Sequence, residues 1–148
     1  MASFKRGPSA PSVVELLEGF LLSAAGMSRS RVIFGKTGED LAVRELERRG
    51  YVVVARRYRR RGGELDIIAR DGPTLVFVEV KTRQDRAFGD AAESIGFFKR
   101  RCMARVAQDY VIRHRLTDCP CRFDVVSIHA GEGQPVIEVF QNAFDVIV

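Results

Sequence analysis

The chain has 148 residues, 46% of them hydrophobic and 29% charged, a balance typical of one globular domain with a single core. No apolar run is long enough to cross a bilayer, and three cysteines make a poor disulfide framework. The net charge of +5 favours polyanions, nucleic acid before an anionic membrane surface, although a solvated basic surface gives the same charge. We therefore expect a cytoplasmic protein with reduced thiols that does not bind membranes.

The first residues differ in composition from the rest. Residues 1–31 begin with a stretch rich in Gly, Pro and Ser, followed by a short amphipathic helix candidate from Val13 to Leu22. Two glutamates interrupt this helix, which argues against a signal peptide. Met27 is an alternative start of the protein. We expect an N-terminal appendage over 1–31 and one domain over 32–148.

The domain is predicted to open with a helix. Thr37 followed by Asp40 resembles a capping box, and Gly50 is a typical residue just beyond a helix C-terminus. The inward stripe of this helix is predicted to contain Ala42, Val43 and Leu46. Glu39 falls on the same stripe, so its carboxylate either turns out to water or points into a polar site.

The remaining pattern predicts five strands and a second helix. The helix is expected over 91–113, with Gly96 shortening or splitting it. The strands are expected at Tyr51–Ala55, Leu65–Arg70, Leu75–Lys81, Arg122–Ile128 and Val136–Phe140. This order predicts an α/β fold in which helices flank a mixed central β-sheet of about five strands.

Two acidic residues are predicted to meet across a hairpin. The turn at residues 71–74 pairs Arg70 with Leu75. Counting back along both strands places Asp66 opposite Glu79, and Glu64 opposite Lys81. Carboxylates directly opposed on neighbouring strands repel each other. Such a pair needs a physical reason.

A divalent cation is one such reason. Mg²⁺ is commonly held by one or two carboxylates together with substrate phosphate and water. A metal held by Asp66 and Glu79 would lower the pKa of bound water, while Lys81 would neutralise transition-state charge or orient the nucleophile. Glu39 would add a carboxylate, through water or a second metal. The structural alternative is an edge-strand Glu79–Lys81 charge pair with Asp66 capping a turn.

The cationic residues offer candidate contacts for phosphate. Lys99 lies on the inward stripe of the second helix, where it either contacts phosphate or extends past apolar neighbours to water. Arginines around Tyr58 would position a nucleic acid without reading its sequence, or form a solvated strand end. They are Arg56, Arg57, Arg59, Arg60 and Arg61. Asp124 is expected to be structural, and the two histidines are assigned no site.

Several blocks resemble the YraN-like family of uncharacterised bacterial proteins. In chain order they are "GKTGEDLAVRELERRGYVVVARRYR", "GELDIIARDG", "LVFVEVKTR", "RFDVVSI" and "NAF". They cover Gly35 to Phe144. That family is grouped with the restriction-endonuclease-like superfamily, whose core is similar to that of archaeal Holliday-junction resolvases. The resemblance therefore implies a restriction-endonuclease-like core.

The resemblance also implies an activity. It identifies Asp66 as the Asp of the superfamily motif and Glu79 and Lys81 as its Glu-x-Lys, with Glu39 on the first helix. Mg²⁺ or Mn²⁺ would be the cofactor, and cleavage would leave a 5′-phosphate and a 3′-hydroxyl. One departure is Leu65, which stands where the motif has proline.

The function that we predict is a metal-dependent endonuclease, selective for branched or junction-like DNA. DNA is expected rather than RNA, because no RNA-binding motif is present. A homodimer is a further expectation, since resolvase-like cores pair on two-fold substrates. The alternative is a non-catalytic nucleic-acid-binding module on a nuclease-like fold.

Overall fold

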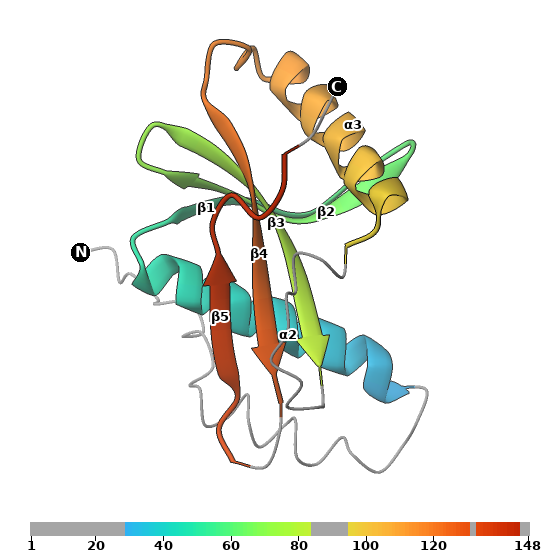
Figure 1. The fold of residues 1–148 in the computed structure, drawn as a ribbon, viewed down its shortest axis with the longest axis vertical. Coiled ribbons are helices and arrows are strands. Elements are labelled where there is room, and N and C mark those ends of the chain that lie inside the picture. The colour runs from blue at the N-terminus through green and yellow to red at the C-terminus, as the bar shows by residue number, and fades with distance from the viewer. Residues whose placement is uncertain (1–28, 84–94, 131–132, 146–148) are drawn as a thin grey trace, which may run out of the picture. The chain divides into compact units, whose positions relative to one another are not determined.

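The order of helices and strands follows the sequence prediction. The computed structural model describes residues 29–83, 95–130 and 133–145, and two units divide the chain, Met1–Thr37 and Gly38–Val148. The prediction for residues 1–31 falls almost wholly outside the described residues. The elements are α2 Arg29–Arg48, β1 Val52–Arg60, β2 Gly63–Asp71, β3 Thr74–Arg83, α3 Phe97–Arg113, β4 Cys121–His129 and β5 Val136–Phe140 (Figure 1).

The described strands form one mixed sheet in the order β1-β2-β3-β4-β5. Neighbouring strands are antiparallel except β3 and β4, which are parallel. The connection between these two contains α3, as a parallel pair requires a crossover. The predicted α/β fold is confirmed, and the arrangement is consistent with a restriction-endonuclease-like core.

The predicted start of the first helix was wrong. Thr37 is not an N-cap, because α2 is already helical from Arg29. The helix continues through Gly38, where an added Cβ would lie 2.3 Å from Thr82 Oγ1 of β3. A side chain at this position would require Thr82 to move, so close packing favours glycine here, and Gly38 does not break the helix. The end was predicted correctly, since Gly50 follows the helix with a φ of 94°.

Each face of the sheet carries buried apolar side chains. One face packs beneath α3, where Phe77, Met103, Val106 and Tyr110 belong to a single core cluster. The Gly38–Arg48 part of α2 crosses the other face (Figure 1). Its buried side chains are Leu41, Ala42 and Leu46, whereas the predicted Val43 is only half-buried. The two layers explain why β2 and β3 are apolar on both sides.

The arginine run belongs to a strand. The predicted first strand ended at Ala55, but β1 continues to Arg60 through alternating half-buried and exposed residues. Arg57, whose φ is 50°, lies between the residues paired with Ile67 and Leu65, and so at the level of Asp66 on β2. Leu65 and Ile68 then both join the core beneath α3, so the predicted strict alternation along β2 also fails. A local kink in this hairpin therefore lies beside Asp66.

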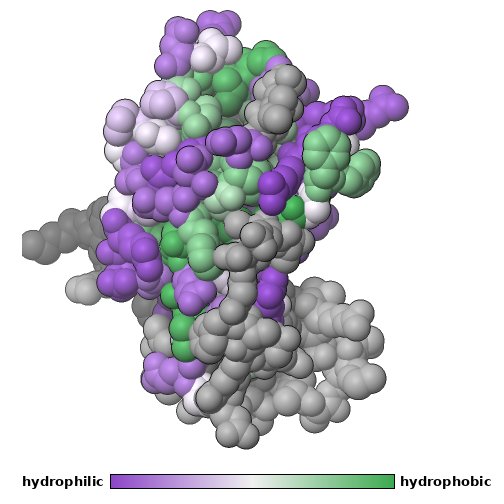
Figure 2. Space-filling model, viewed as in Figure 1, coloured by the Kyte–Doolittle hydropathy of each residue, from purple (hydrophilic) through white to green (hydrophobic). Residues whose placement is uncertain are grey.

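The described surface includes an aromatic patch at the start of α3. Phe97 and Phe98 are 75% and 80% exposed. Figure 2 shows hydrophobic surface beside hydrophilic surface at this end of the helix. In the part of the chain that the structure describes, no helix combines the length and apolar character needed to span a membrane.

Candidate active site

The hairpin of β2 and β3 has the predicted register. Arg70 pairs with Leu75, and the ladder continues to Ile67 opposite Val78, one position before Asp66 and Glu79. There the ladder ends. The backbone N–H of Val80, beyond that point, donates to Asp66 Oδ2 at 2.8 Å. The half-buried Asp66 carboxylate thus replaces a backbone acceptor where the two strands diverge.

Glu79 is the most deeply buried acid of this site. It is 6% exposed, and it lies on the face of β3 that packs towards α3. Its Oε2 is buried without a hydrogen-bond partner, the only such side-chain oxygen or nitrogen among the described residues. A buried oxygen that lacks a partner costs free energy, so its presence calls for an explanation such as a bound ion.

Two lysines face the same carboxylate. Lys99 Nζ of α3 lies 3.6 Å from Glu79 Oε1, with the lysine side chain 43% exposed. Lys81, two residues along β3, is half-buried and lies on the same face. The structure therefore brings together Asp66, Glu79, Lys81 and Lys99, which we call the candidate active site.

The pKa of Glu79 reflects these surroundings. Burial is the main cause that raises the pKa from its ordinary value of 4.5 to about 7, and the negative charge of Asp66 raises it further. The charges of Lys99 and Lys81 partly oppose the shift. The pair of carboxylates, hereafter the acidic pair, therefore holds a proton readily near neutral pH.

Glu79→Gln is expected to stabilise the metal-free protein, and more so at pH 8 than at pH 5. The folded protein holds the Glu79 proton more tightly than the unfolded chain, so wild-type stability falls as pH rises from 4.5 to about 7. A shift of this size, which already includes the opposing attraction of Lys99, corresponds to at most about 3 kcal/mol. Thermal unfolding in EDTA, followed by circular dichroism at both pH values, measures the difference.

Glu64→Gln is the matched control for that comparison. Glu64 lies on the same strand as Asp66, half-buried, and its Oε2 accepts a hydrogen bond from Arg59 Nε at 3.0 Å. The ladder ends at Ile67 and Val78, so neither of the predicted direct pairings, Asp66 with Glu79 and Glu64 with Lys81, is part of it. A Glu79→Gln effect that is equal at both pH values would contradict the raised pKa.

The residues fit one hard divalent cation. Two carboxylates, with water and substrate phosphate, form a usual set for Mg²⁺. The described residues contain no group of three or more His, Cys, Asp or Glu side chains that could form a complete cage. Glu39 is not part of such a group: its Oε2 accepts from Arg57 Nε at 2.7 Å and lies 3.8 Å from Arg56 Nη2. Glu39 contacts the kink of β1 opposite Asp66.

Most of the arginine run is engaged by acidic residues of this chain. Four of its five members form ion pairs with carboxylates, and in two of these pairs the carboxylate belongs to α2. The pairs are Arg56–Asp40, Arg57–Glu39, Arg59–Glu64 and Arg60–Asp109. Arg61 has no such ion pair within the described ranges. The four paired arginine side chains remain 37% to 73% exposed, and their role as phosphate contacts stays a prediction.

A second polar row lies beside Lys81 and was missed in the sequence. Ser127 pairs with Lys81 across the parallel strands, and its Oγ is 3.1 Å from His129 Nε2. Glu138 Oε2 of β5 lies 3.7 Å from the same nitrogen. Ser127 and His129 alternate with apolar residues along β4, which is a signal in the sequence that they share one face of the strand. The pairing of β4 with β3 shows that this is the face of the sheet on which Glu79 lies.

Asp124 has the structural role that we predicted. It is fully buried, with Tyr51 OH donating to its Oδ2 at 3.0 Å and Arg122 Nε donating to its Oδ1 at 3.0 Å. The Asn142 N–H also donates to Oδ1. Arg122 reaches Asp71 at 2.7 Å as well. This network joins four segments of the chain. It lies on the opposite face of the sheet from Glu79, because Glu79 pairs with Val125, the neighbour of Asp124.

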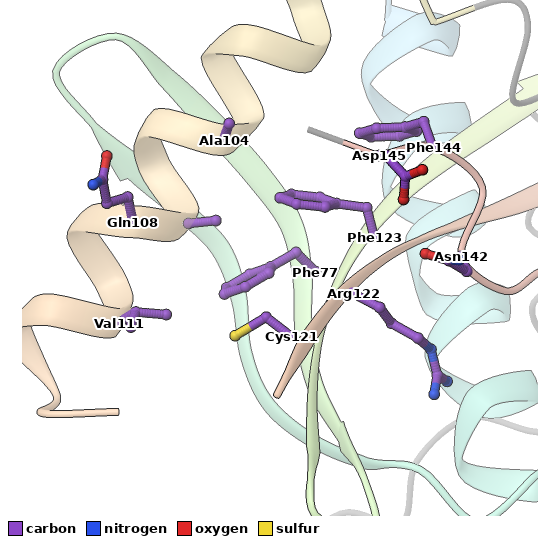
Figure 3. A pocket seen from close by; sticks show the side chains of 11 residues that line it. Phe77, Ala104, Gln108, Val111, Cys121, Arg122, Phe123, Asn142, Phe144 and Asp145 are labelled. Carbon is purple, nitrogen blue, oxygen red and sulfur yellow. The ribbon is translucent and has the colours of Figure 1, made fainter. Parts of the chain in front are cut away.

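A cavity of about 360 Å³ lies between α3, the sheet and the C-terminal segment. Phe77 and Phe123 point from the sheet towards α3, and Phe144 lies beside them (Figure 3). No residue of the candidate active site lines it. The cavity is mainly apolar, so it carries none of the chemistry predicted for the acidic pair.

The fold defines an α/β protein that is consistent with a restriction-endonuclease-like core. Residues 38–128 match the family described as "Uncharacterised protein family UPF0102", so the chain belongs to this family, and the predicted YraN-like identity is confirmed. A UPF0102 protein of Geobacter metallireducens is 44% identical over 119 residues, covering 80% of this chain and 98% of the relative. A second, from Nitrosospira multiformis, is 47% identical over 112 residues, covering 76% and 92%. Their names state no activity.

Proposed function

We propose that this protein is a metal-dependent endonuclease that hydrolyses phosphodiester bonds in DNA. The observation that carries the proposal is Glu79 Oε2, a buried carboxylate oxygen without a partner, next to a second carboxylate on the neighbouring strand. Keeping two acids together in this position costs stability, and a divalent cation offsets that cost. Edge-strand pairing does not explain it, because β3 is an interior strand.

Asp66 and Glu79 would hold Mg²⁺ or Mn²⁺, and Lys81 and Lys99 would contact the substrate. When bound, the metal supplies Lewis acidity and lowers the pKa of a coordinated water. Lys81 would neutralise the negative charge that grows on the phosphoryl oxygens. Lys99, which now contacts Glu79 Oε1, would be released towards phosphate once a cation neutralises that carboxylate. Glu39 acts one step away, by holding the kinked strand through Arg57.

Structure-selective cleavage of branched or junction-like DNA is the substrate preference that we propose. The family resemblance and the net charge of +5 support it. We also propose a cytoplasmic location, in keeping with three free cysteines among the described residues. A homodimer would place two such sites on a two-fold substrate.

A cleavage screen tests the proposal. Junction, flap, nicked and blunt duplex DNA are incubated with the wild-type protein in Mg²⁺ and in Mn²⁺, and with Lys81→Ala as the inactive control. We expect metal-dependent products from at least one branched substrate, and none in EDTA. A protein that binds these DNAs but cleaves none of them in either metal is the non-catalytic binding module, and the endonuclease proposal fails.

A further inference from the structure

We propose that Phe97 and Phe98 form a stacking platform for an unpaired base of the DNA substrate, next to the candidate active site. This inference rests on the proposed function and names the feature of DNA that the site would select. The substrate class is DNA in which at least one base beside the scissile phosphate is unstacked. Flaps, gaps and branch points provide such bases, whereas blunt duplex does not.

The exposure of these two rings is the first observation. At 75% and 80%, they are the most exposed large hydrophobic side chains among the described residues. Two adjacent phenylalanines in water are unfavourable unless a ligand covers them. Nucleobases suit such rings because every base has a flat π-face, and stacking does not depend on base identity.

Charge complementarity is the second observation. The first turn of α3 carries no acidic residue; it contains Lys99, and the exposed Arg101 follows it. The neighbouring Arg100 is half-buried and donates to the Ile95 carbonyl. The Arg101 guanidinium lies 5.7 Å from the centre of the Phe97 ring. Arg105, one turn further along, is exposed on the same face as Arg101. Exposed aromatic rings among cations are typical of surfaces that bind single-stranded nucleic acid.

Continuity with the acidic pair is the third observation. Lys99 Nζ lies 3.6 Å from Glu79 Oε1, and Phe98 is the preceding residue, so the two Cα atoms are about 3.8 Å apart. Successive helical side chains point about 100° apart, so Lys99 reaches into the site while Phe98 projects to solvent. A nucleotide whose phosphate contacts Lys99 can therefore place its base beside Phe98.

A tryptophan probe tests the contact directly, because the chain contains no tryptophan. Phe98→Trp is titrated with single-stranded and with blunt duplex DNA in EDTA, so that binding is observed without cleavage. The matched control is Ile112→Trp, at an exposed position on the same helix, 14 residues or about 21 Å further along. We expect single-stranded DNA to quench Phe98→Trp more than duplex does, with no quenching in the control. Equal quenching of both variants, or of neither, overturns the proposal.

Affinity measurements provide the second arm. The Phe97→Ala/Phe98→Ala protein should bind flap DNA about 5- to 150-fold more weakly than wild type, the range expected for loss of base stacking. Its affinity for blunt duplex should change little, and Ile112→Ala should change neither. If the preference for flap DNA survives the double substitution while wild type still cleaves, the platform is wrong and the endonuclease proposal stands. Selective loss of flap binding by a protein that never cleaves supports the platform and refutes catalysis.

Self-association is the competing use of this patch. Sedimentation velocity of the wild-type and double-substituted proteins distinguishes the two. One combined outcome overturns the stacking proposal: the wild type is a dimer, the double variant is a monomer, and the affinity for every DNA falls equally. The patch would then be a contact between copies of this chain.

Discussion

DNA cleavage by Glu79→Gln or Asp66→Asn is expected to fall at least about 10³-fold in Mg²⁺, because a metal contributes several kcal/mol to the transition state and each 1.36 kcal/mol is a tenfold change in rate. Both substitutions keep the size of the side chain and remove its charge. In each variant the introduced amide would leave the remaining carboxylate to bind the cation alone. The rate is measured on the branched substrate that wild type cleaves best.

Metal binding separates this mechanism from simple misfolding. Isothermal titration with Mn²⁺ should show one site in wild type and none in either variant, while circular dichroism shows all three folded. Glu64→Gln, whose partner is Arg59, should keep both binding and cleavage. Retention of full cleavage by Glu79→Gln would remove the acidic pair from the mechanism.

Asp124→Ala is expected to destabilise the protein by about 3–5 kcal/mol, the usual cost of breaking a buried ion pair by removal of one partner. The change would leave Arg122 Nε and Tyr51 OH without their acceptor in a position that is fully buried. The Asn142 N–H would lose its acceptor too. Urea unfolding followed by circular dichroism at pH 7 measures the loss.

A graded pair of variants checks the origin of that loss. Tyr51→Phe removes one hydroxyl from the same network and should cost about 1–3 kcal/mol. The double variant Tyr51→Phe/Asp124→Ala should lose less unfolding free energy than the two single variants lose together, because the two side chains share a hydrogen bond of 3.0 Å. Strict additivity, or a loss under about 1 kcal/mol for Asp124→Ala, would show that the network contributes little.

Element types were predictable where side-chain periodicity is strong. The β2–β3 hairpin is the clearest case, because the turn residues and the two apolar runs together allowed one register, and Arg70 does pair with Leu75. Element boundaries were less predictable. Thr37 and Asp40 resemble a capping box, yet α2 continues through both residues. The close packing of Gly38 against Thr82 of β3 cannot be read from local sequence.

The arginine run shows a similar limit. Its charge indicated a surface, and the side chains are exposed to different degrees, as expected. What the run contacts was not predictable, because Glu39, Asp40 and Asp109 approach it from helices 16 to 49 residues away in sequence. Ser127 and His129 were missed for the same reason: their neighbours on the sheet follow from strand order.

The sequence by itself determined that Asp66 and Glu79 approach each other, because both lie on one short hairpin whose register depends on local turn chemistry and the two-residue period of a strand. Only the tertiary structure decided how deeply Glu79 is buried and that Lys99 reaches it. Both depend on how α3, which connects β3 to β4 in the chain, packs on the face of the sheet. Burial and approaching charge set the affinity of the site for protons and cations. Side-chain pattern can thus predict which two carboxylates come together, but long-range packing creates their electrostatic environment.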